Sequence, residues 1–423
     1  TVSLVRALTR STVLGAMAGL GLAVTPSVWA IGTRAEAHAL HLALVAILFR
    51  LLVGWESARR RPDSRDATHS DRWLVAAAVV FGLSVGNHSL TLLLALPVGL
   101  YVLAVDPAVL RRPRLVLTCI AALTATVAAV FLELPLRAGP FRAPLVYGHP
   151  ETWDGFWYVV LGQQFQGSLI DPFGDLAGKA AILAARTVAQ FGVLAVLIPV
   201  GFVATCVVRP RYGLLSGLAV ATTVFFAASY VNADIGRYYL GPILIAWTWL
   251  AIGASAIGAA VAGPGADHGV GHRTGPIPRT ALAGLLAVLL LIPSALAVPG
   301  RFAAVDASQE TDARRWVEFA LTAMARDAVV VSWWSYSTPL WYAQHIEGRR
   351  TDITIVDDRT RLDEALGDFT DVIDANLGIR PVYVIRDDPR EVALLAERYV
   401  LEPIGGPDAR FLTRVVGRRE PAS

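Results

Sequence analysis

The chain has 423 residues, a formal net charge of +3 and only 17% charged residues, against about 25% in an average soluble domain. The deficit is uneven, because 37 of the 71 charged residues follow Pro299. This distribution excludes a single soluble globule and a disordered chain, and the small net charge argues against a nucleic-acid partner. We predict a multispan membrane domain at 1–299 and a soluble domain at 300–423.

Apolar runs suited to membrane-spanning helices fill the first domain. About 20 helical residues cross the hydrocarbon core of a bilayer. The third and fourth runs are divided at the polar tripeptide Gly86-Asn87-His88. The nine runs are 12–31, 36–54, 73–87, 89–105, 115–135, 188–208, 213–231, 238–262 and 280–299. The predicted fold class is therefore mainly α, a polytopic helical membrane protein with a small C-terminal α/β domain.

The distribution of basic residues predicts the orientation, because cytoplasmic loops are enriched in Lys and Arg. With a cytoplasmic N-terminus, the inner segments hold 15 basic residues and the outer segments before Pro299 hold six. The tail then lies outside the cytoplasm, and we expect an integral protein of a bacterial plasma membrane. The predicted cytoplasmic loops are 55–72, 106–114, 209–212 and 263–279, the last being Gly/Pro-rich and typical of a flexible linker.

The outer stretch 136–187 is long and aromatic, and its segments 151–165 and 175–187 have the pattern of amphipathic helices on the outer leaflet. In the tail, β-rich runs alternate with helical patterns, which predicts a parallel sheet covered by helices. No glycine-rich nucleotide-binding motif follows these runs. The runs are 328–332, 353–356 and 381–385, and the helical patterns are 310–326, 336–347, 362–376 and 389–398.

Polar residues near membrane depth are costly and therefore mark functional sites. The first such cluster, between spans one and two, holds Arg34, Glu36 and His38. Glu36 is suited to act as a general base, or to bind a metal or a substrate hydroxyl; the alternative is a surface pair with Arg34 or a simple helix start. His88 of the second cluster is either functional or a satisfied structural histidine. This cluster comprises Asn87, His88, Ser89 and Thr91.

Two more clusters follow on the same predicted face. Arg137, just outside a span, is placed to bind a phosphate bidentately or to reach lipid headgroups, and the run from His149 to Asp154 comes after it. A tight loop then holds Asn232, Asp234, Arg237 and Tyr238, which is either a site or a turn in an aromatic belt. We predict that Glu36, His88, Arg137 and Arg237 converge on one outer-facing cavity that suits a lipid-linked anionic substrate.

Several stretches together resemble a known family. They are Trp29 with Ala35-Glu36-Ala37-His38-Ala39-Leu40-His41, Gly82-Leu83-Ser84-Val85-Gly86-Asn87-His88, Leu134-Pro135-Leu136-Arg137, Gly148-His149-Pro150-Glu151-Thr152-Trp153-Asp154-Gly155-Phe156, Trp341-Tyr342-Ala343-Gln344 and Arg350-Thr351-Asp352-Ile353. In order and spacing they resemble the protein O-mannosyltransferases first catalogued as a domain of unknown function. His38 replaces the family's tyrosine and His149 its aspartate.

The resemblance implies a C-type glycosyltransferase that moves a sugar, mannose in this family, from a polyprenyl-phosphate donor to a hydroxyl of an acceptor protein outside the cytoplasm. It implies that Glu36 positions substrate or acts as a secondary base, with His88 as a helper. Arg137 and Arg237 then contact phosphate, and the other predicted substrate-binding residues are Arg34, Asp154, Asn232, Asp234 and Tyr238. The metal requirement stays open, with a divalent cation as the cofactor considered.

The family's D-S-G-E and H-P-P-G-Y stretches have no counterpart in the sequence, so we expect them, with two further spans, to precede Thr1. The competing function is a transporter or flippase of lipid-linked sugars, which shares the spans and the cationic outer loops. That class usually shows an internal repeat and polar residues deep within its helices, and neither is apparent. A scaffold whose outer domain binds partners is a third possibility, but it leaves the polar outer loops unexplained.

Overall fold

The computed structural model describes residues 1–60, 67–232, 234–262, 279–406 and 409–419. The chain forms two compact units, which are described separately. The first comprises Thr1–Glu133 and Gln164–Asp306, and the second comprises Leu134–Gln163 and Ala307–Ser423. The linker predicted at 263–279 lies outside the described residues except for its last position.

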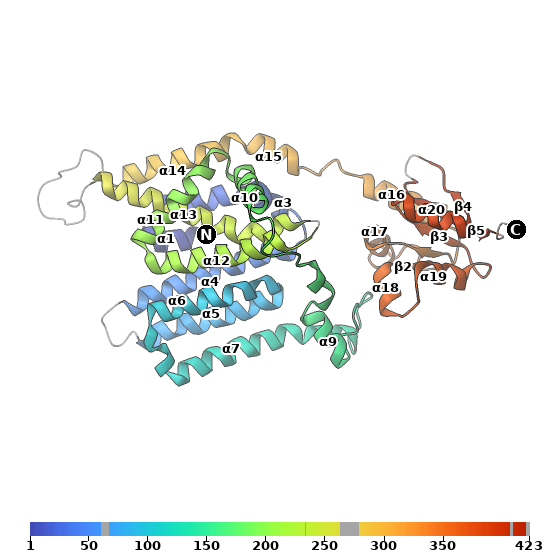
Figure 1. Cartoon of the computed structure of the whole chain (residues 1–423), viewed down its shortest axis with the longest axis horizontal. Coiled ribbons are helices and arrows are strands. Elements are labelled where there is room, and N and C mark those ends of the chain that lie inside the picture. The colour runs from blue at the N-terminus through green and yellow to red at the C-terminus, as the bar shows by residue number, and fades with distance from the viewer. Residues whose placement is uncertain (61–66, 233, 263–278, 407–408, 420–423) are drawn as a thin grey trace, which may run out of the picture. The chain divides into compact units, whose positions relative to one another are not determined.

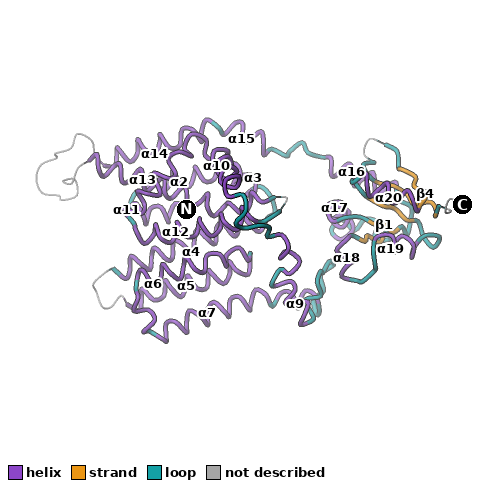
Figure 2. Tube along the Cα trace, viewed as in Figure 1, coloured by secondary structure: helices purple, strands orange, loops and turns teal. Residues whose placement is uncertain are grey.

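The first unit is a bundle of helices packed around one apolar core (Figure 1, Figure 2). Its helices are α1 (Val2–Thr9), α2 (Thr12–Ala23), α3 (Pro26–Gly32), α4 (Ala37–Arg59), α5 (Ala67–Asn87), α6 (Ala95–Val105), α7 (Pro113–Phe131), α10 (Leu176–Phe191), α11 (Leu197–Val208), α12 (Pro210–Ser229), α13 (Leu240–Ala262), α14 (Arg279–Leu296) and α15 (Val298–Val305). Short 3₁₀ helices join them: η2 (Ser89–Leu94), η3 (Pro107–Arg111), η5 (Gly192–Val196) and η6 (Ile235–Tyr239), with η4 (Gln163–Ser168) at the boundary between the units.

Each of the nine predicted apolar runs is largely helical in the described structure. Among the described residues, five helices are long and apolar enough to cross a membrane, or up to seven if each of two bent helix pairs counts as one span. The predicted runs 73–87 and 89–105, which became α5 and η2–α6, are not among these. The helical membrane fold is therefore confirmed, whereas the count of nine spans stays a prediction.

The first predicted span is not one straight helix, because α2 and α3 meet at an angle of 70°. Pro26 is the first residue of α3 and has no N–H to continue the hydrogen bonds of α2. At the bend, the Thr25 hydroxyl accepts a hydrogen bond of 3.0 Å from the indole of Trp247 on α13. A side chain at Gly21 would collide with the same indole, so glycine is required for the contact between α2 and α13.

The second unit contains a five-stranded sheet in the order β2-β1-β3-β5-β4. β1 (Val329–Val331) pairs in parallel with β2 (Thr354–Val356) and β3 (Val382–Ile385), which confirms the predicted strands and their parallel pairing. Two strands that were not predicted, β4 (Tyr399–Pro403) and β5 (Leu412–Arg418), add an antiparallel edge. The helices are α8 (Glu133–Ala138), which starts at the unit boundary, α9 (Trp153–Val160), α16 (Asp312–Ala323), α17 (Trp334–His345), α18 (Asp358–Asp363), α19 (Phe369–Asn376) and α20 (Pro389–Arg398).

Segment 134–163 packs with the C-terminal sheet unit, although it was predicted to be part of an outer loop of the membrane domain. The Tyr147 ring lies 6.5 Å from the Trp341 ring, and the backbone N–H of Gly148 donates to the Asp363 carboxylate at 3.0 Å. His149 is also bound to this unit, because its Nε2 lies 2.9 Å from the carbonyl oxygen of Asp363. These contacts join residues far apart in the chain, which sequence patterns do not reveal.

Candidate functional site

A polar cluster of the first unit forms where three segments meet. The segments are the N-terminus of α4, the junction of α5 with η2, and η6. The Asn87 side chain donates a hydrogen bond of 3.0 Å to the carbonyl of Ala37, which fixes the end of α5 against the start of α4. We call Glu36, His38, His41, His88 and Arg237 the imidazole cluster, since three of its five members are histidines.

Glu36 is the residue before the first turn of α4 and has an extended backbone there. Its Oε1 accepts from Arg237 Nη1 at 3.1 Å, and its Oε2 lies 3.2 Å from His38 Nδ1. Arg34, in contrast, is exposed, and within the described ranges no ion pair joins it to Glu36. The surface pair considered from the sequence is thus replaced by a pair with an arginine 201 positions away.

His38 is oriented by Glu36. An ionised carboxylate can only accept hydrogen bonds, so the Nδ1 of His38 carries the proton that it donates to Glu36. Its Nε2 then holds a lone pair, and this atom is buried without a hydrogen-bond partner among the described residues. The imidazole packs against the rings of His88, at 4.5 Å, and Tyr238, at 5.6 Å.

His88 has the structural role that the sequence left open for it. Its Nδ1 accepts a hydrogen bond of 3.1 Å from the N–H of Leu90, which caps η2. Burial, followed by repulsion from the protonated form of His38 and from the positive charge of Arg237, lowers the pKa of His88 to about 4. The ring is therefore neutral at physiological pH, and its Nε2 carries a proton because Nδ1 accepts. A catalytic role for His88 stays a prediction.

The charge of Glu36 is stabilised by its partners. Burial acts to raise its pKa, but the hydrogen bond with His38 and the positive charge of Arg237 outweigh this, and the pKa lies below its ordinary value. A carboxylate with a lowered pKa is a weaker proton acceptor. The arrangement thus favours Glu36 as a group that orients His38 and Arg237.

The polar network around His41 was not predicted from the sequence, although one of its members, Thr91, belongs to the second predicted cluster. His41 Nδ1 lies 3.4 Å from the Ser84 hydroxyl and 3.3 Å from the Thr91 hydroxyl, which are 2.8 Å apart. Beside His41 and Arg237 is a cavity of about 20 Å³, which is large enough for one water molecule. The available signal was the spacing of His38 and His41, which places both on one face of α4.

The loop before η6 supplies the remaining predicted residues of this unit. Arg237 Nη2 donates to Asn232 at 3.4 Å, and the same Asn232 oxygen accepts from the N–H of Asp234 at 2.9 Å. Asp234 itself is exposed. Tyr238 is buried, stacks on Tyr230 and meets His88 edge-on at 5.7 Å. Of the predicted set, the structure therefore brings together Glu36, His88, Asn232, Arg237 and Tyr238.

Arg137 and Asp154 belong to the second unit. Arg137 is exposed in the last turn of α8, and Asp154 is exposed in the first turn of α9. Nearby, His149 pairs with Glu151 at 3.0 Å, and its backbone contact at Asp363 and this pair raise its pKa. Convergence of Arg137 with the imidazole cluster stays a prediction.

An apolar groove of about 510 Å³ borders η6. It is lined by α10, α11, α12 and α13, and by Gly236 and Tyr239 of η6. Half-buried Arg186 also lines it, with its guanidinium 5.5 Å from the centre of the Tyr239 ring. Across the described part of the chain, no carboxylate forms an ion pair with Arg186. The sequence predicted an amphipathic helix at this position but no role for the arginine.

A metal site was also considered for this cluster. Among the residues that the structure describes, no group of three or more His, Cys, Asp or Glu side chains has the arrangement of a metal site. The imidazole cluster is instead held by the carboxylate, the guanidinium and the ring contacts described above.

The chain is similar to known proteins in part of its sequence and in its fold. Residues 5–110, which include Glu36, His38 and His88, match the family described as "Protein O-mannosyl-transferase TMEM260 N-terminal domain". No curated protein matches the chain. The crystal structure of ArnT from Cupriavidus metallidurans bound to undecaprenyl phosphate is similar, with a TM-score of 0.60 and 15% identity over 98% of this chain and 81% of ArnT. Residues 5–110 thus match this family model, the chain shares the fold of ArnT, and the predicted resemblance is confirmed.

Proposed function

We propose that this protein is a membrane glycosyltransferase that moves a sugar, mannose, from a polyprenyl-phosphate donor to a hydroxyl group of an acceptor protein on the extracytoplasmic face of a bacterial plasma membrane. The observation that carries the proposal is the imidazole cluster, in which a carboxylate orients a histidine whose second nitrogen is unpartnered among the described residues. The cluster includes residues of the segment that matches a protein O-mannosyltransferase family model, and a groove suited to an isoprenoid chain lies beside it.

The proposed reaction gives a role to three residues of the imidazole cluster, which are His38, Glu36 and Arg237. The acceptor oxygen bonds to the anomeric carbon of the sugar while the bond from that carbon to the phosphate oxygen breaks. The acceptor proton passes to the lone pair on His38 Nε2, and Glu36 stabilises the imidazolium that forms. The polyprenyl phosphate leaves with the electron pair of the broken bond. Arg237 keeps Glu36 ionised and provides positive charge beside the leaving phosphate.

The same geometry requires a local movement. The rings of His88 and Tyr238 pack against His38, and its Nε2 has almost no exposed surface. A substrate hydroxyl reaches this nitrogen only if one of these rings turns aside. Tyr238 is the residue suited to this, because η6 is a single short 3₁₀ helix, whereas His88 is held by the cap on η2.

The apolar groove and Arg186 on its wall support a polyprenyl-phosphate donor. An isoprenoid chain is apolar and flexible, and the groove surface is mainly apolar, with Arg186 on its wall. The guanidinium of Arg186 is close to Gly236, because a Cβ atom added to this glycine would lie 3.9 Å from its Nη1. Because Gly236 and Arg237 are neighbours in η6, a lipid in the groove places its phosphate near the imidazole cluster. Arg186 therefore joins Arg137 and Arg237 as a proposed phosphate contact.

The deciding experiment is sugar transfer by the protein in nanodiscs. Purified protein is given polyprenyl phosphate carrying mannose, glucose or 4-amino-arabinose, together with acceptor peptides rich in Ser and Thr. Transfer of mannose to a peptide hydroxyl, detected by mass spectrometry, supports the proposal. Transfer of another sugar overturns the choice of mannose, and movement of the donor across liposome membranes without transfer favours a flippase.

One pair of variants tests the donor site. Arg186→Ala removes a cation from the groove, so the KM for the donor should rise about tenfold, the loss of one charge-assisted contact, while kcat changes little. Arg114→Ala is the matched control, because Arg114 is an exposed residue in the first turn of α7 and belongs neither to the cluster nor to the groove, so its kinetics should equal those of the wild type. An unchanged donor KM in Arg186→Ala would remove this arginine from the donor site.

A second experiment tests on which side of the membrane the second unit lies. Cys119 and Cys206 are replaced by serine, and single cysteines are introduced at exposed Glu397 of the second unit or at Arg111 in the predicted cytoplasmic loop 106–114. An impermeant maleimide added to intact cells should label position 397 and not position 111. The reverse labelling pattern would contradict the extracytoplasmic location of the reaction.

A further inference from the structure

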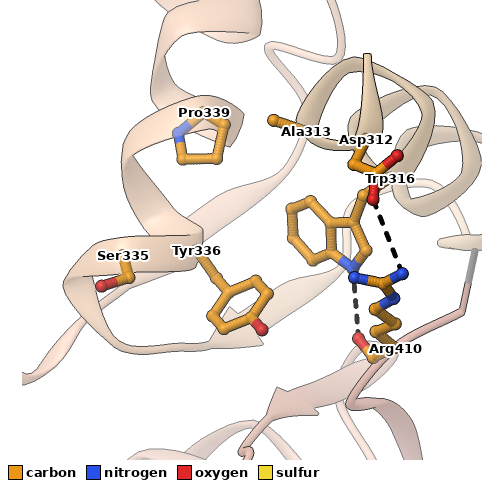
Figure 3. Close-up of a pocket in the computed structure, with 7 residues that line it drawn as sticks. All are labelled: Asp312, Ala313, Trp316, Ser335, Tyr336, Pro339 and Arg410. Atoms are coloured by element: carbon orange, nitrogen blue, oxygen red, sulfur yellow. Dashed lines mark hydrogen bonds and ion pairs between the residues drawn. The ribbon is translucent and has the colours of Figure 1, made fainter. Parts of the chain in front are cut away.

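A pocket in the second unit has features of a binding site that the proposed transfer reaction does not use (Figure 3). Its volume is about 150 Å³, and it is formed by α16, α17 and Arg410, which precedes β5. All of its lining residues lie within one compact unit. They are Asp312, Ala313, Trp316, Ser335, Tyr336, Pro339 and Arg410.

Aromatic rings form the walls of this pocket. The rings of Trp316 and Tyr336 are 5.0 Å apart and tilted by 60°. Trp316 is held in place, because its indole N–H donates to the carbonyl of Arg410 at 3.1 Å. Tyr336 is supported by Phe411 and Trp333, each with its ring centre 5.9 Å away. The walls are therefore fixed before any ligand binds, which lowers the entropic cost of binding.

Charged groups of both signs, a carboxylate and a guanidinium, lie beside these rings. Arg410 Nη2 is 3.6 Å from a carboxylate oxygen of Asp312, and both side chains are largely exposed. Figure 3 shows this pair beside the Trp316 indole. On the opposite side, Pro339 lies within α17 and has no N–H to donate to the carbonyl of Ser335 four residues earlier. The pocket thus offers a carboxylate, a guanidinium and the polar groups of Ser335 around an apolar floor.

The charges and the size define the ligand. Asp312 is paired with both Arg410 and Arg315, so its negative charge is already compensated by side chains of the protein. A neutral molecule with both donors and acceptors can hydrogen-bond to these groups without bringing a charge that needs a partner. An extended peptide needs a groove several residues long, but this pocket is a single depression between two helices. We propose that it binds one neutral hexose ring, with a C–H face against Trp316 and Tyr336 and hydroxyl groups on Asp312 and Arg410. This inference does not depend on the proposed transfer function.

The test measures binding without turnover. The full chain in nanodiscs is titrated with methyl mannoside, methyl glucoside, methyl galactoside or a sugar-free peptide containing proline, and binding is followed by saturation-transfer NMR. Saturation of the ring C–H protons of at least one glycoside is the expected result. Binding of the peptide with no glycoside, or of no probe at all, would overturn the proposal.

Matched variants locate the binding. Asp312→Ala and Arg410→Ala should each weaken glycoside binding about tenfold, because each removes a charge-assisted hydrogen bond. Tyr336→Leu keeps the apolar volume but should abolish saturation of the C–H face. Glu397→Ala and Arg390→Ala, exposed residues of α20 in the same unit, should bind as the wild type does.

Unchanged glycoside binding in both Asp312→Ala and Arg410→Ala would exclude this pocket as the glycoside-binding site. Glycoside binding in this pocket can also be distinguished from the proposed transfer reaction. Glu36→Gln should keep glycoside binding whether or not it loses transfer, since Glu36 lies in the other unit.

Discussion

The two ends of α4 each carry a glutamate, yet their surroundings differ in kind. At the N-terminal end, Glu36 contacts one arginine and one histidine. Near the C-terminal end, the Glu56 carboxylate pairs with Arg60 and with Arg211, and it also accepts from the Tyr101 hydroxyl at 2.8 Å. One carboxylate orients a group that can exchange a proton at neutral pH, and the other is surrounded by arginines that cannot.

The network extends further at the Glu56 end. Asp106 accepts from Arg59 at 2.7 Å and from Arg112 at 2.6 Å, and Arg112 also pairs with Asp71 at 2.7 Å. These pairs connect α4 to α5, to η3 and to the residue before α7. The predicted cytoplasmic end is thus rich in arginines that fix helix ends, while the predicted outer end holds the histidines. The comparison teaches that a charged residue at a helix end indicates function only together with its partners.

The largest expected effect distinguishes the two glutamates. Glu36→Gln should lower kcat about 10²–10⁴-fold, because His38 loses the anion that stabilises its protonated form. Glu56→Gln should lower the thermal midpoint but leave turnover per folded molecule nearly unchanged, since its partners serve the fold. Both are measured by sugar transfer at matched folded concentration, with folding checked by size-exclusion chromatography. Equal turnover in the two variants would contradict the distinction.

A smaller effect should separate two histidines within the imidazole cluster. His38→Gln removes the proposed proton acceptor and should lower kcat about 10²-fold, the lower end of the range for a proton-transfer group. His41→Gln disturbs only the network with Ser84 and Thr91, so it should affect stability more than kcat. Pre-steady-state transfer with the donor prebound measures the chemical step directly. A slower step in His41→Gln than in His38→Gln would reverse the assignment.

The smallest expected effect is on stability as a function of pH. The pKa of His88 is about 4 in the fold against 6.5 in the unfolded chain, so the unfolded state binds the proton first as the pH falls. The contribution of neutral His88 to the free energy of unfolding is present above pH 6.5 and is lost progressively between pH 6.5 and about 4. His88→Asn should therefore flatten the decline of the thermal midpoint in this interval. An identical decline in wild type and variant would show that another group is responsible.

Much of the fold was predictable because its signals are local. Apolar runs placed the helices of the first unit, since a membrane requires long apolar segments with internally bonded backbones. The alternation of β-rich and helical runs identified β1, β2 and β3 and their parallel pairing. The bend between α2 and α3 and the antiparallel edge of β4 and β5 were missed. The bend depends on a contact with Trp247 as well as on Pro26. The strands β4 and β5, which pair with each other, have the sequences YVLEP and LTRVVGR, whose charged residues, proline and glycine weaken the local strand signal.

The sequence by itself determined which residue types stand at the ends of the predicted spans, and thereby singled out Glu36, His88 and Arg237. Only the tertiary structure decided how they pair. It joined Glu36 to Arg237 instead of Arg34, assigned His88 to a helix cap, and left the Nε2 of His38 buried without a partner among the described residues. The physical reason is that the properties of a charged or titratable group depend on neighbours within a few ångströms, and those neighbours come from helices far apart in the chain.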